Sequence, residues 1–297
     1  MLDAKLDTLL AVAECKNFTR AAELLSLTQP AVSNHIGQLE RECNAKLFLR
    51  EKGAFKLTPE GEIALLYAKR LKALYEKMLS EITDEQRHIS RLRVGITHSS
   101  ENNLIVETLA KYVDRYPHIT ITIVTDVINN LYEMLENYEL DLAIVEGKRL
   151  SSKLNYFMLD TDYLVCVLNK EAPLAKHSLV TVNDLKKENM ILRLPASATR
   201  QLFEATLVSV GESIDDFNIS LEVDNVATIK DLVRKNLGVS ILPKSVCVGD
   251  VKKGKLAVLP IENLSMMREV NIAYNKDFTR LDILKEFVEL YQTEMKK

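Results

Sequence analysis

The sequence predicts an α/β protein in which short helices and a small β-hairpin lead into a long helix and then into a larger region of alternating strands and helices. Three observations carry this prediction. Apolar residues recur at helical spacing over the first 40 residues, one apolar stripe continues from about residue 59 to 87, and strand-like runs alternate with helical stretches from residue 91 onward. The 297 residues, 47% of them hydrophobic, are enough for more than one domain with its own core.

The N-terminal segment is predicted to form three helices. Leucines and alanines at helical spacing indicate the first, and Asn17 or Thr19 is expected to cap the second. The inner face of this second helix is expected to consist of Ala21, Ala22, Leu24 and Leu25. After a break at residues 26–28, Thr28 is predicted to cap a third helix with Pro30 in its first turn, where proline loses no needed hydrogen bond.

Two helices joined by so short a break fit either an ordinary packed helical hairpin or a unit that reads DNA. DNA reading requires small residues where the helices cross and polar side chains near the start of the second helix. Ala21, Ala22 and Ala31 meet the first requirement. For the second, amide groups pair with adenine, hydroxyls bond several bases, and a proline ring can meet a thymine methyl. The candidate DNA-binding residues of this helix are Thr28, Gln29, Pro30, Ser33, Asn34 and His35.

A β-hairpin is predicted next, with strands over 46–49 and 54–57 and a turn at 51–53. Cations on or beside it are Lys46, Arg50, Lys52 and Lys56. Arg50 and Lys52 are candidates for contact with phosphates or a narrow minor groove. The alternative is a polar hairpin that is simply solvated.

The long helix is predicted from about residue 59 to about residue 87, with Thr58 as its cap and Pro59 at its start. Its apolar stripe has steps of three and four residues and consists of Ile63, Tyr67, Leu71, Leu74, Met78 and Ile82. Because no globular partner lies nearby in the sequence, the stripe favours pairing with another helix over packing against its own domain.

From residue 91 the pattern changes to strands and helices in turn. The predicted strands are 91–97, 119–125, 140–147, 163–169, 190–194, 218–223 and 270–275. The predicted helices are 101–117, 129–139, 198–209, 226–235 and 282–296. Such alternation predicts a parallel sheet with helices on both faces. By length alone this region is either one large domain or two small lobes.

Several function classes find no support in the sequence. The net charge of −3 gives no global argument for nucleic-acid binding, and the four cysteines have no metal-binding spacing. Neither GxSxG, nor GxGxxG, nor a P-loop occurs, so an α/β enzyme with an unrelated helical N-terminus is disfavoured. A secreted solute-binding protein would need a signal peptide, which the first residues do not resemble. We therefore expect no catalysis, no cofactor, no metal, and a soluble cytoplasmic protein.

A set of short motifs then carries a family resemblance. The motifs are "FTRAAELL" at 18–25, "TQPAVS" at 28–33, "IGQLE" at 36–40, "LFLR" at 47–50, "LTPEG" at 57–61, "RLRVGIT" at 91–97, "LDLAIV" at 140–145 and "LGVSILP" at 237–243. In this order and spacing the chain resembles the LysR-type transcriptional regulators, strongly to residue 61 and diffusely after it.

The resemblance implies a cytoplasmic regulator that binds double-stranded DNA through a winged helix-turn-helix and assembles through its linker helices into a homodimer and a homotetramer. Gln29, Pro30 and Ser33 would face the major groove, and Arg50 would reach the backbone or minor groove. The chain departs from the family where arginine or lysine often stands, at positions that here are Asn34, Gly37 and Gln38. This departure implies fewer phosphate contacts and a shallower salt dependence.

Domain bounds follow from the same resemblance. The DNA-binding domain would span 1–58, with the helix-turn-helix at about 18–37, and the linker helix would span 59–90. A two-lobed effector domain like the periplasmic binding proteins would have lobe I at 91–161 and 267–297 and lobe II at 162–266. The chain would cross between the lobes near 160–163 and 265–269.

Polar residues at the carboxyl ends of predicted strands mark an expected effector site. They are Thr97, Ser99, Ser100, Thr125, Ser197, Thr199 and Arg200. Each serine or threonine alone would also serve as a helix cap, and only the set favours a binding site. Arg200 would be the charge partner of an anionic small molecule, whereas Glu146 would repel an anion or select an amino group.

Overall fold

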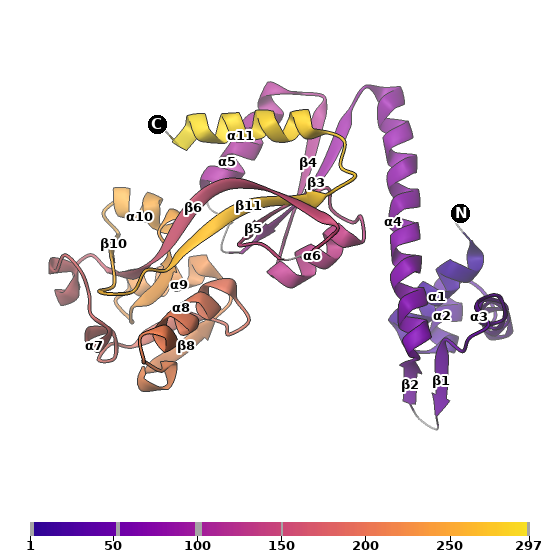
Figure 1. The fold of residues 1–297 in the computed structure, drawn as a ribbon, viewed down its shortest axis with the longest axis horizontal. Helices are drawn as coiled ribbons and strands as arrows, with labels where there is room; N and C mark the ends of the chain where they lie inside the picture. The colour runs from indigo at the N-terminus through magenta and orange to yellow at the C-terminus, as the bar shows by residue number, and fades with distance from the viewer. Residues whose placement is uncertain (1–2, 52–53, 99–102, 150, 296–297) are drawn as a thin grey trace. The chain divides into compact units, whose positions relative to one another are not determined.

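The computed structural model describes residues 3–51, 54–98, 103–149 and 151–295. The chain divides into two compact units: residues 1–90 with 137–139, and residues 91–136 with 140–297 (Figure 1). Each unit is described here by itself.

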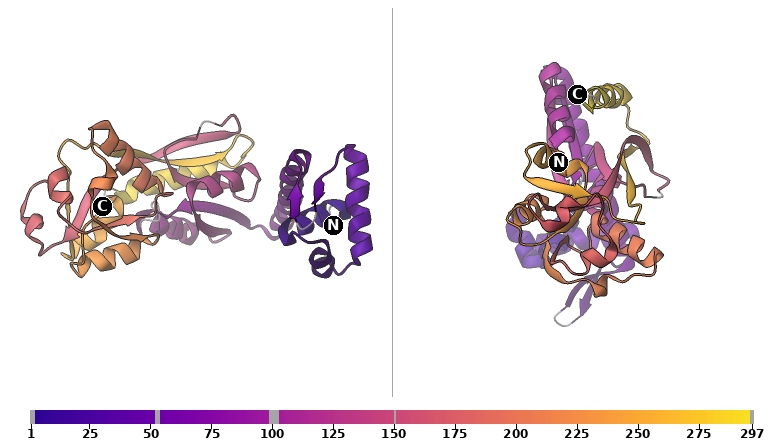
Figure 2. Two further views of the ribbon diagram at one scale, coloured as in Figure 1. Left: turned by 90° about the horizontal axis from the view of Figure 1, so that it is seen from below. Right: turned by 90° about the vertical axis from the view of Figure 1, so that its left-hand side faces the viewer.

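The first unit contains the three helices, the hairpin and the long helix. Its elements are α1 (Ala4–Cys15), α2 (Phe18–Leu25), α3 (Gln29–Cys43), β1 (Phe48–Glu51), β2 (Ala54–Leu57) and α4 (Pro59–Arg87). The indigo helices α1 to α3 gather beside one another in the left-hand view of Figure 2 and share a core to which α4 contributes Ala68. Ala21 and Ala22 are buried in this core, which confirms the close crossing expected from small residues. The cap of α2 is Asn17, whose side chain accepts hydrogen bonds from the backbone N–H groups of Thr19 and Arg20.

Two expectations for this unit were wrong. Leu24 does not lie on the inner face of α2, since its side chain is 60% exposed. The first hairpin strand begins at Phe48 rather than at Lys46. The reason is Glu40 of α3, which accepts hydrogen bonds from Lys46 Nζ at 2.7 Å and from the backbone N–H of Leu47 at 3.0 Å. These bonds hold residues 46–47 against α3 before the hairpin starts.

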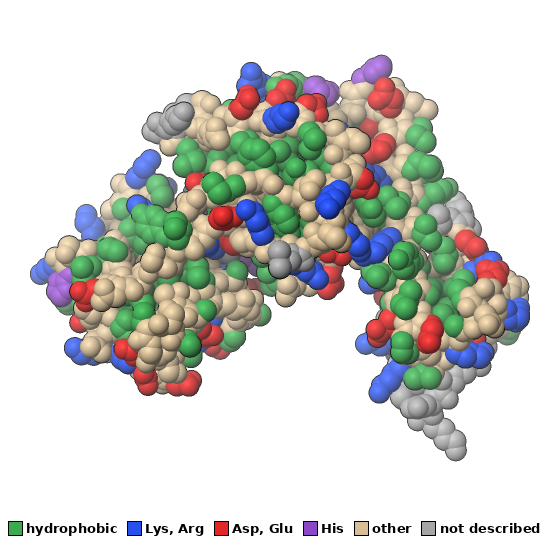
Figure 3. Space-filling view, viewed as in Figure 1, with side chains coloured by type: hydrophobic (Ala, Val, Ile, Leu, Met, Phe, Trp, Pro, Cys, Tyr) green, Lys and Arg blue, Asp and Glu red, His purple; other side chains and the backbone are tan. Residues whose placement is uncertain are grey.

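The long helix α4 begins as predicted, with the Thr58 side chain accepting from the backbone N–H of Gly61. Gly61 is required here, because a Cβ atom would lie 2.0 Å from the carbonyl oxygen of Leu47. The predicted apolar stripe is open to solvent in the single chain: Tyr67, Leu71 and Met78 are 57%, 46% and 46% exposed. Figure 3 shows hydrophobic side chains spaced along this helix. Packing of the stripe against its own domain is therefore not what the structure contains.

The second unit holds the alternating region. Its longer helices are α5 (Asn103–Arg115), α6 (Ile128–Glu136), α8 (Ala198–Ser209), α9 (Val226–Arg234) and α11 (Leu281–Met295), and its short ones are α7 (Val182–Leu185), α10 (Val248–Lys252) and the 3-10 turns η1 (Pro173–Lys176), η2 (Ile214–Asp216) and η3 (Ser245–Cys247). Its strands are β3 (Ser90–Thr97), β4 (Ile119–Asp126), β5 (Leu142–Glu146), β6 (Leu154–Asn169), β7 (Met190–Arg193), β8 (Ile219–Val223), β9 (Ser240–Pro243), β10 (Leu256–Leu259) and β11 (Met267–Asn275).

The main sheet is mixed rather than parallel, which corrects the expectation from strand–helix alternation. Its strand order is β10-β6-β11-β5-β3-β4, with β9 also pairing with β6. Strands β3 and β5 are parallel, but β11 is antiparallel to both β5 and β6. A separate pair, β7 and β8, is parallel. The prediction covered only the second half of β6 and missed β9 and β10.

Strand β6 and strand β11 carry the chain between two lobes with separate cores. The first half of β6 pairs with β11 as far as Tyr163 opposite Met267, and the second half pairs with β9 and β10. Leu159 and Val270 belong to one core with β3, α5 and α11. Leu164 and Met266 belong to another core with β7 and α8. The two-lobed architecture is thus confirmed. Lobe I is the half whose core contains Leu159 and Val270, and lobe II is the half whose core contains Leu164 and Met266.

Candidate functional site

The start of α3 presents the predicted DNA-reading side chains on the surface of the first unit. The Thr28 side chain accepts a hydrogen bond from the backbone N–H of Ala31, and Pro30 lies in the first turn, as expected. The preceding helix ends at Ser26 with a left-handed backbone conformation (φ 56°). Gln29, Pro30 and Asn34 are exposed. Local capping therefore fixes where this helix begins and which polar groups its first turns show.

Gln29 and Ser33 act together on this surface. The Gln29 side-chain amide donates a hydrogen bond to the Ser33 hydroxyl at 2.9 Å, one turn further along the helix. The bond restricts the rotamer of a long side chain before any partner binds. A pre-ordered amide loses less conformational entropy when it pairs with a base edge.

His35 is placed differently from its neighbours, because its ring contacts α1. The Thr8 hydroxyl donates its one hydrogen to the carbonyl oxygen of Ala4 at 2.7 Å. His35 Nδ1 lies 2.9 Å from the Thr8 hydroxyl oxygen. Because the hydroxyl hydrogen is already donated to Ala4, the ring N–H of His35 is the donor in this second bond. His35 thus ties α3 to α1, and its role towards DNA stays a prediction.

The hairpin contributes less that can be described. Strand β1 places Arg50 opposite Phe55 of β2. The Arg50 side chain and the whole of Lys52 lie outside the described residues. Lys56 of β2 is exposed. Contact of Arg50 and Lys52 with DNA remains a prediction.

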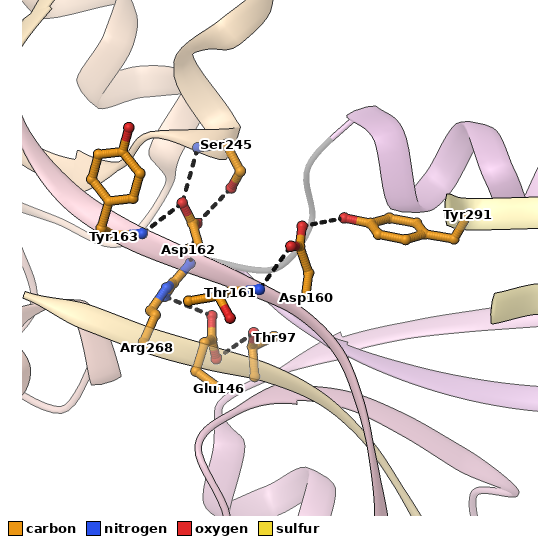
Figure 4. Close-up of polar contacts among 9 residues, drawn as sticks. All are labelled: Thr97, Glu146, Asp160, Thr161, Asp162, Tyr163, Ser245, Arg268 and Tyr291. Atoms are coloured by element: carbon orange, nitrogen blue, oxygen red, sulfur yellow. Dashed lines mark hydrogen bonds and ion pairs between the residues drawn. The ribbon is translucent and has the colours of Figure 1, made fainter. Parts of the chain in front are cut away.

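In the second unit, a buried ionic network runs along the crossing strands (Figure 4). Arg268 of β11 donates to Glu146 of β5 at 2.9 Å and to Asp162 of β6 at 3.2 Å. Thr97, at the end of β3, donates its hydroxyl hydrogen to the other oxygen of Glu146 at 2.8 Å. Ser245 of η3 donates to Asp162 at 2.7 Å. Hydrogen-bonded side chains therefore connect the strand ends of lobe I to lobe II through one arginine.

This network changes the expected role of Thr97 and Glu146. Both side chains are buried and bonded to each other, and Arg268 neutralises Glu146. Glu146 therefore does not stand as an uncompensated negative charge at the strand ends. Thr125 lies in β4 and is half-buried, while Ser99 and Ser100 are outside the described residues.

The lobe II candidates lie together at the start of α8. The Ser197 side chain caps this helix by accepting from the backbone N–H of Arg200 at 3.2 Å. Thr199 is buried, and its hydroxyl has no hydrogen-bond partner among the described residues. Arg200 is buried and bonded to Glu204. A second carboxylate, that of Glu222, lies 3.6 Å from NH1 of Arg200. Its charge is thus already matched by two carboxylates of lobe II.

Arg193, which the sequence reasoning missed, ends β7 just before this helix. Its side chain is 3% exposed and forms an ion pair with Asp224 at 3.2 Å, whose own side chain is 57% exposed. Nε and NH1 of Arg193 are buried without a hydrogen-bond partner in the described part of the chain. Burial lowers the pKa of this guanidinium, Asp224 and Glu146 oppose that shift, and Arg268 adds to it. The charges of Glu146 and Arg268 in the ionic network therefore influence the pKa of Arg193.

The missed residues had a recognisable signal. Arg193 is the single charge in the apolar run "MILRL", and Arg268 stands near the start of another apolar strand. Arginine is rarely buried without a partner, so each pattern indicates an ion pair or a ligand contact. The partners were not predictable, because Glu146 and Asp162 lie 122 and 106 residues from Arg268.

Three further features concern possible metal ligands, thiols and the apolar character of helices among the described residues. No three His, Cys, Asp or Glu side chains among them are arranged to hold a metal ion. Burial raises the pKa of the Cys166 and Cys247 thiols to about 12, so neither is a thiolate at neutral pH. Within the same residues, no helix has the length and apolar character needed to span a membrane.

Comparison with known proteins agrees with this arrangement. The model of the "LysR substrate binding domain" matches residues 85–296, and that of the "bacterial regulatory helix-turn-helix protein, lysR family" matches residues 4–62. The HTH-type transcriptional regulator CysL of Bacillus subtilis is 28% identical over 272 residues, covering 91% of this chain and 90% of that protein.

Two solved structures share the fold. Full-length CbnR complexed with its target DNA is 18% identical with a TM-score of 0.67, over 98% of both chains. The regulatory domain of Synechocystis PCC6803 CcmR in complex with 2-PG is 21% identical with a TM-score of 0.60, over 69% of this chain and 97% of that one.

Proposed function

The chain belongs to the LysR family of transcriptional regulators, and we propose from this premise how its residues divide the work. It is a DNA-binding transcription regulator whose effector domain binds a small molecule. We assign DNA reading to the first turns of α3 and effector binding to the strand ends of the two lobes. We place the protein in the cytoplasm, because a regulator of transcription acts where the DNA is. We also assign it no catalysis.

The observation that carries the DNA assignment is the hydrogen-bonded pair of exposed Gln29 and half-buried Ser33 at a capped helix start. Amide and hydroxyl groups at this position reach base edges when the helix lies in the major groove. Thr28, Pro30 and Asn34 flank the pair, and Arg50 and Lys52 would bind the backbone or minor groove. The CbnR structure with target DNA has the same fold, which supports this docking mode.

The exposed stripe of α4 supports assembly of the protein as a homodimer. Eight large apolar side chains of this helix are solvent-exposed in the single chain: Ile63, Leu66, Tyr67, Leu71, Leu74, Met78, Leu79 and Ile82. Pairing of two such helices would remove them from water. We keep 1–58 as the DNA-binding domain and 59–90 as the linker helix, and a homotetramer would join two such dimers.

The effector site is proposed between lobe I, at 91–161 and 267–297, and lobe II, at 162–266. Thr97, Ser99, Ser100 and Thr125 would contribute from lobe I, and Ser197, Thr199 and Arg200 from lobe II. The ionic network through Arg268 supports this, since it links the strand ends of both lobes. An effector that binds one arrangement of the lobes more tightly would shift the protein towards it.

Selection of bound fragments from a genomic DNA pool tests this function. The wild-type protein is expected to enrich a small set of sites that share an imperfect palindrome, because a dimer presents two copies of α3. Enrichment of nothing, both alone and in the presence of a metabolite extract, would contradict the proposed function.

A further inference from the structure

Buried hydrogen-bond donors without partners are concentrated where β7 leads into α8. Four such atoms lie in residues 193–200: Nε and NH1 of Arg193, Oγ1 of Thr199 and NH1 of Arg200. Buried polar atoms in folded proteins nearly always have a hydrogen-bond partner. Several such atoms within eight residues, none with a partner among the described residues, are therefore an argument for a bound ligand at this place.

The chemistry of these atoms determines what that group must be. The guanidinium nitrogens of Arg193 and Arg200 are donors only, and the Thr199 hydroxyl can donate as well. The missing partner must therefore offer several acceptors. Oxyanions such as carboxylates, phosphates and sulfates do so and form short, charge-assisted bonds with guanidinium groups.

The two arginines are not equivalent in this respect. Arg200 is bonded to Glu204 and lies near Glu222, so carboxylates of the chain already match its charge. Among the residues that the structure describes, Arg193 has one carboxylate partner, Asp224, which is more than half exposed and therefore screened by water. Glu146, which influences Arg193 electrostatically, is itself bonded to Arg268 and Thr97. Arg193 is thus a buried cation with two donors that no described residue pairs.

We propose that Arg193, assisted by Thr199, binds an oxyanion group of the effector, which is therefore a carboxylate, phosphate or sulfate compound. This inference rests on the proposed effector site and names its ligand class. It moves the charge partner from Arg200, which the sequence suggested, to Arg193. Glu146 does not oppose the binding of an anion here, because Arg268 compensates its negative charge.

The test compares full-length wild type with Arg193→Met, Arg193→Lys and Lys255→Gln. Lys255 is an exposed cation of the same unit, so its substitution controls for a general loss of positive charge. Sodium sulfate, phosphate and acetate are titrated against sodium chloride at matched ionic strength, by calorimetry and by thermal unfolding. Sulfate and phosphate stabilise folded proteins generally, so the difference between variants is the readout.

At least one of the three anions is expected to bind wild type and Lys255→Gln equally. Arg193→Met should bind it at least about tenfold more weakly, and Arg193→Lys should lie between, because lysine keeps the charge but lacks the planar set of donors. In chloride, Arg193→Met should unfold at an equal or higher temperature, since it removes an incompletely matched buried charge.

Two results would overturn the inference. One is anion binding that is absent from wild type or unchanged by both Arg193 substitutions. The other is stabilisation of wild type by neutral or cationic metabolites and not by anionic ones, in which case the proposed effector-binding function stands and only the ligand class is wrong. If Arg193→Met does not fold, Arg193→Lys decides alone.

Discussion

Glu146 and Arg268 form a buried ion pair, with Oε1 of Glu146 2.9 Å from NH1 of Arg268 and both side chains less than 10% exposed. Arg268 also bonds Asp162, so one guanidinium serves two buried carboxylates. Arg268 lies on β11 and Asp162 on β6, the two strands that carry the chain between the lobes. Arg268 thus joins a buried carboxylate of lobe I to Asp162 of lobe II, which in turn is bonded to Ser245.

Substitution of Arg268 should destabilise the effector domain strongly. Arg268→Gln leaves Glu146 and Asp162 buried without their cation, and loss of one partner from a buried ion pair costs about 3–5 kcal/mol. Denaturant unfolding at neutral pH measures this loss. In the triple variant Arg268→Met/Glu146→Gln/Asp162→Asn the charges are removed together, and stability should largely return. A triple variant as unstable as Arg268→Gln would show that packing, not charge, is responsible.

Charged substitutions in the α4 stripe should convert the dimer to a monomer. Leu71 and Met78 lie on the exposed apolar face, and a glutamate at either place would be buried in the proposed helix–helix interface. Sedimentation velocity of Leu71→Glu and Met78→Glu should show a halved mass at micromolar concentration. Lys72→Glu, at an exposed neighbouring position, should stay dimeric. A dimer that survives both stripe substitutions would contradict assembly through α4.

Glu40 should stabilise the DNA-binding unit in a pH-dependent way. Burial alone would raise the pKa of Glu40, but hydrogen bonds from Lys46 and from backbone N–H groups outweigh it and hold the pKa below its ordinary 4.5. A carboxyl whose pKa is lowered by folding contributes stability above its unfolded pKa and loses it as pH falls through the folded pKa. Glu40→Gln should therefore cost about 1–2 kcal/mol at pH 7.

The difference between wild type and Glu40→Gln should shrink as the pH falls below about 4.5. Hydrogen exchange of the backbone amides of residues 40–48 measures it locally. Glu23→Gln, at an exposed position of α2, serves as the control. A difference that is constant from pH 7 to acidic pH would show that the Glu40 carboxylate charge is not involved.

Local signals were the part of the structure that the sequence predicted well. Asn17, Thr28 and Thr58 cap their helices because each cap needs only a side chain and an N–H group two or three residues away. The prediction for the buried face of α2 was wrong at Leu24, since an eight-residue helix buries only a narrow face. The predicted start of the hairpin was wrong because Glu40 accepts a hydrogen bond from the backbone N–H of Leu47, seven residues later.

Non-local pairing decided the remainder. The first half of β6 was missed because its run "LNYFMLDTD" mixes apolar and polar residues, and its strand conformation depends on pairing with β11, more than 100 residues later. Antiparallel β11 likewise made the sheet mixed, which strand–helix alternation cannot reveal. At the effector site the same limit applied: Thr97 and Thr199, chosen because they lie at strand ends, remain predictions. Arg193 stood out only in the structure, where two of its buried donors have no hydrogen-bond partner among the described residues.

The proposed reading of the DNA sequence by the first turns of α3 can be measured as a difference in affinity between two duplexes. Fluorescence anisotropy would compare the affinity for a selected duplex with that for a shuffled one, for wild type, Gln29→Ala/Ser33→Ala and the exposed control Gln86→Ala. Wild type and Gln86→Ala should prefer the selected site, and the double variant should lose about 1–3 kcal/mol of that preference while keeping its binding to the shuffled duplex. A double variant with the wild-type preference would contradict the claim, because the sequence would then be read by other residues.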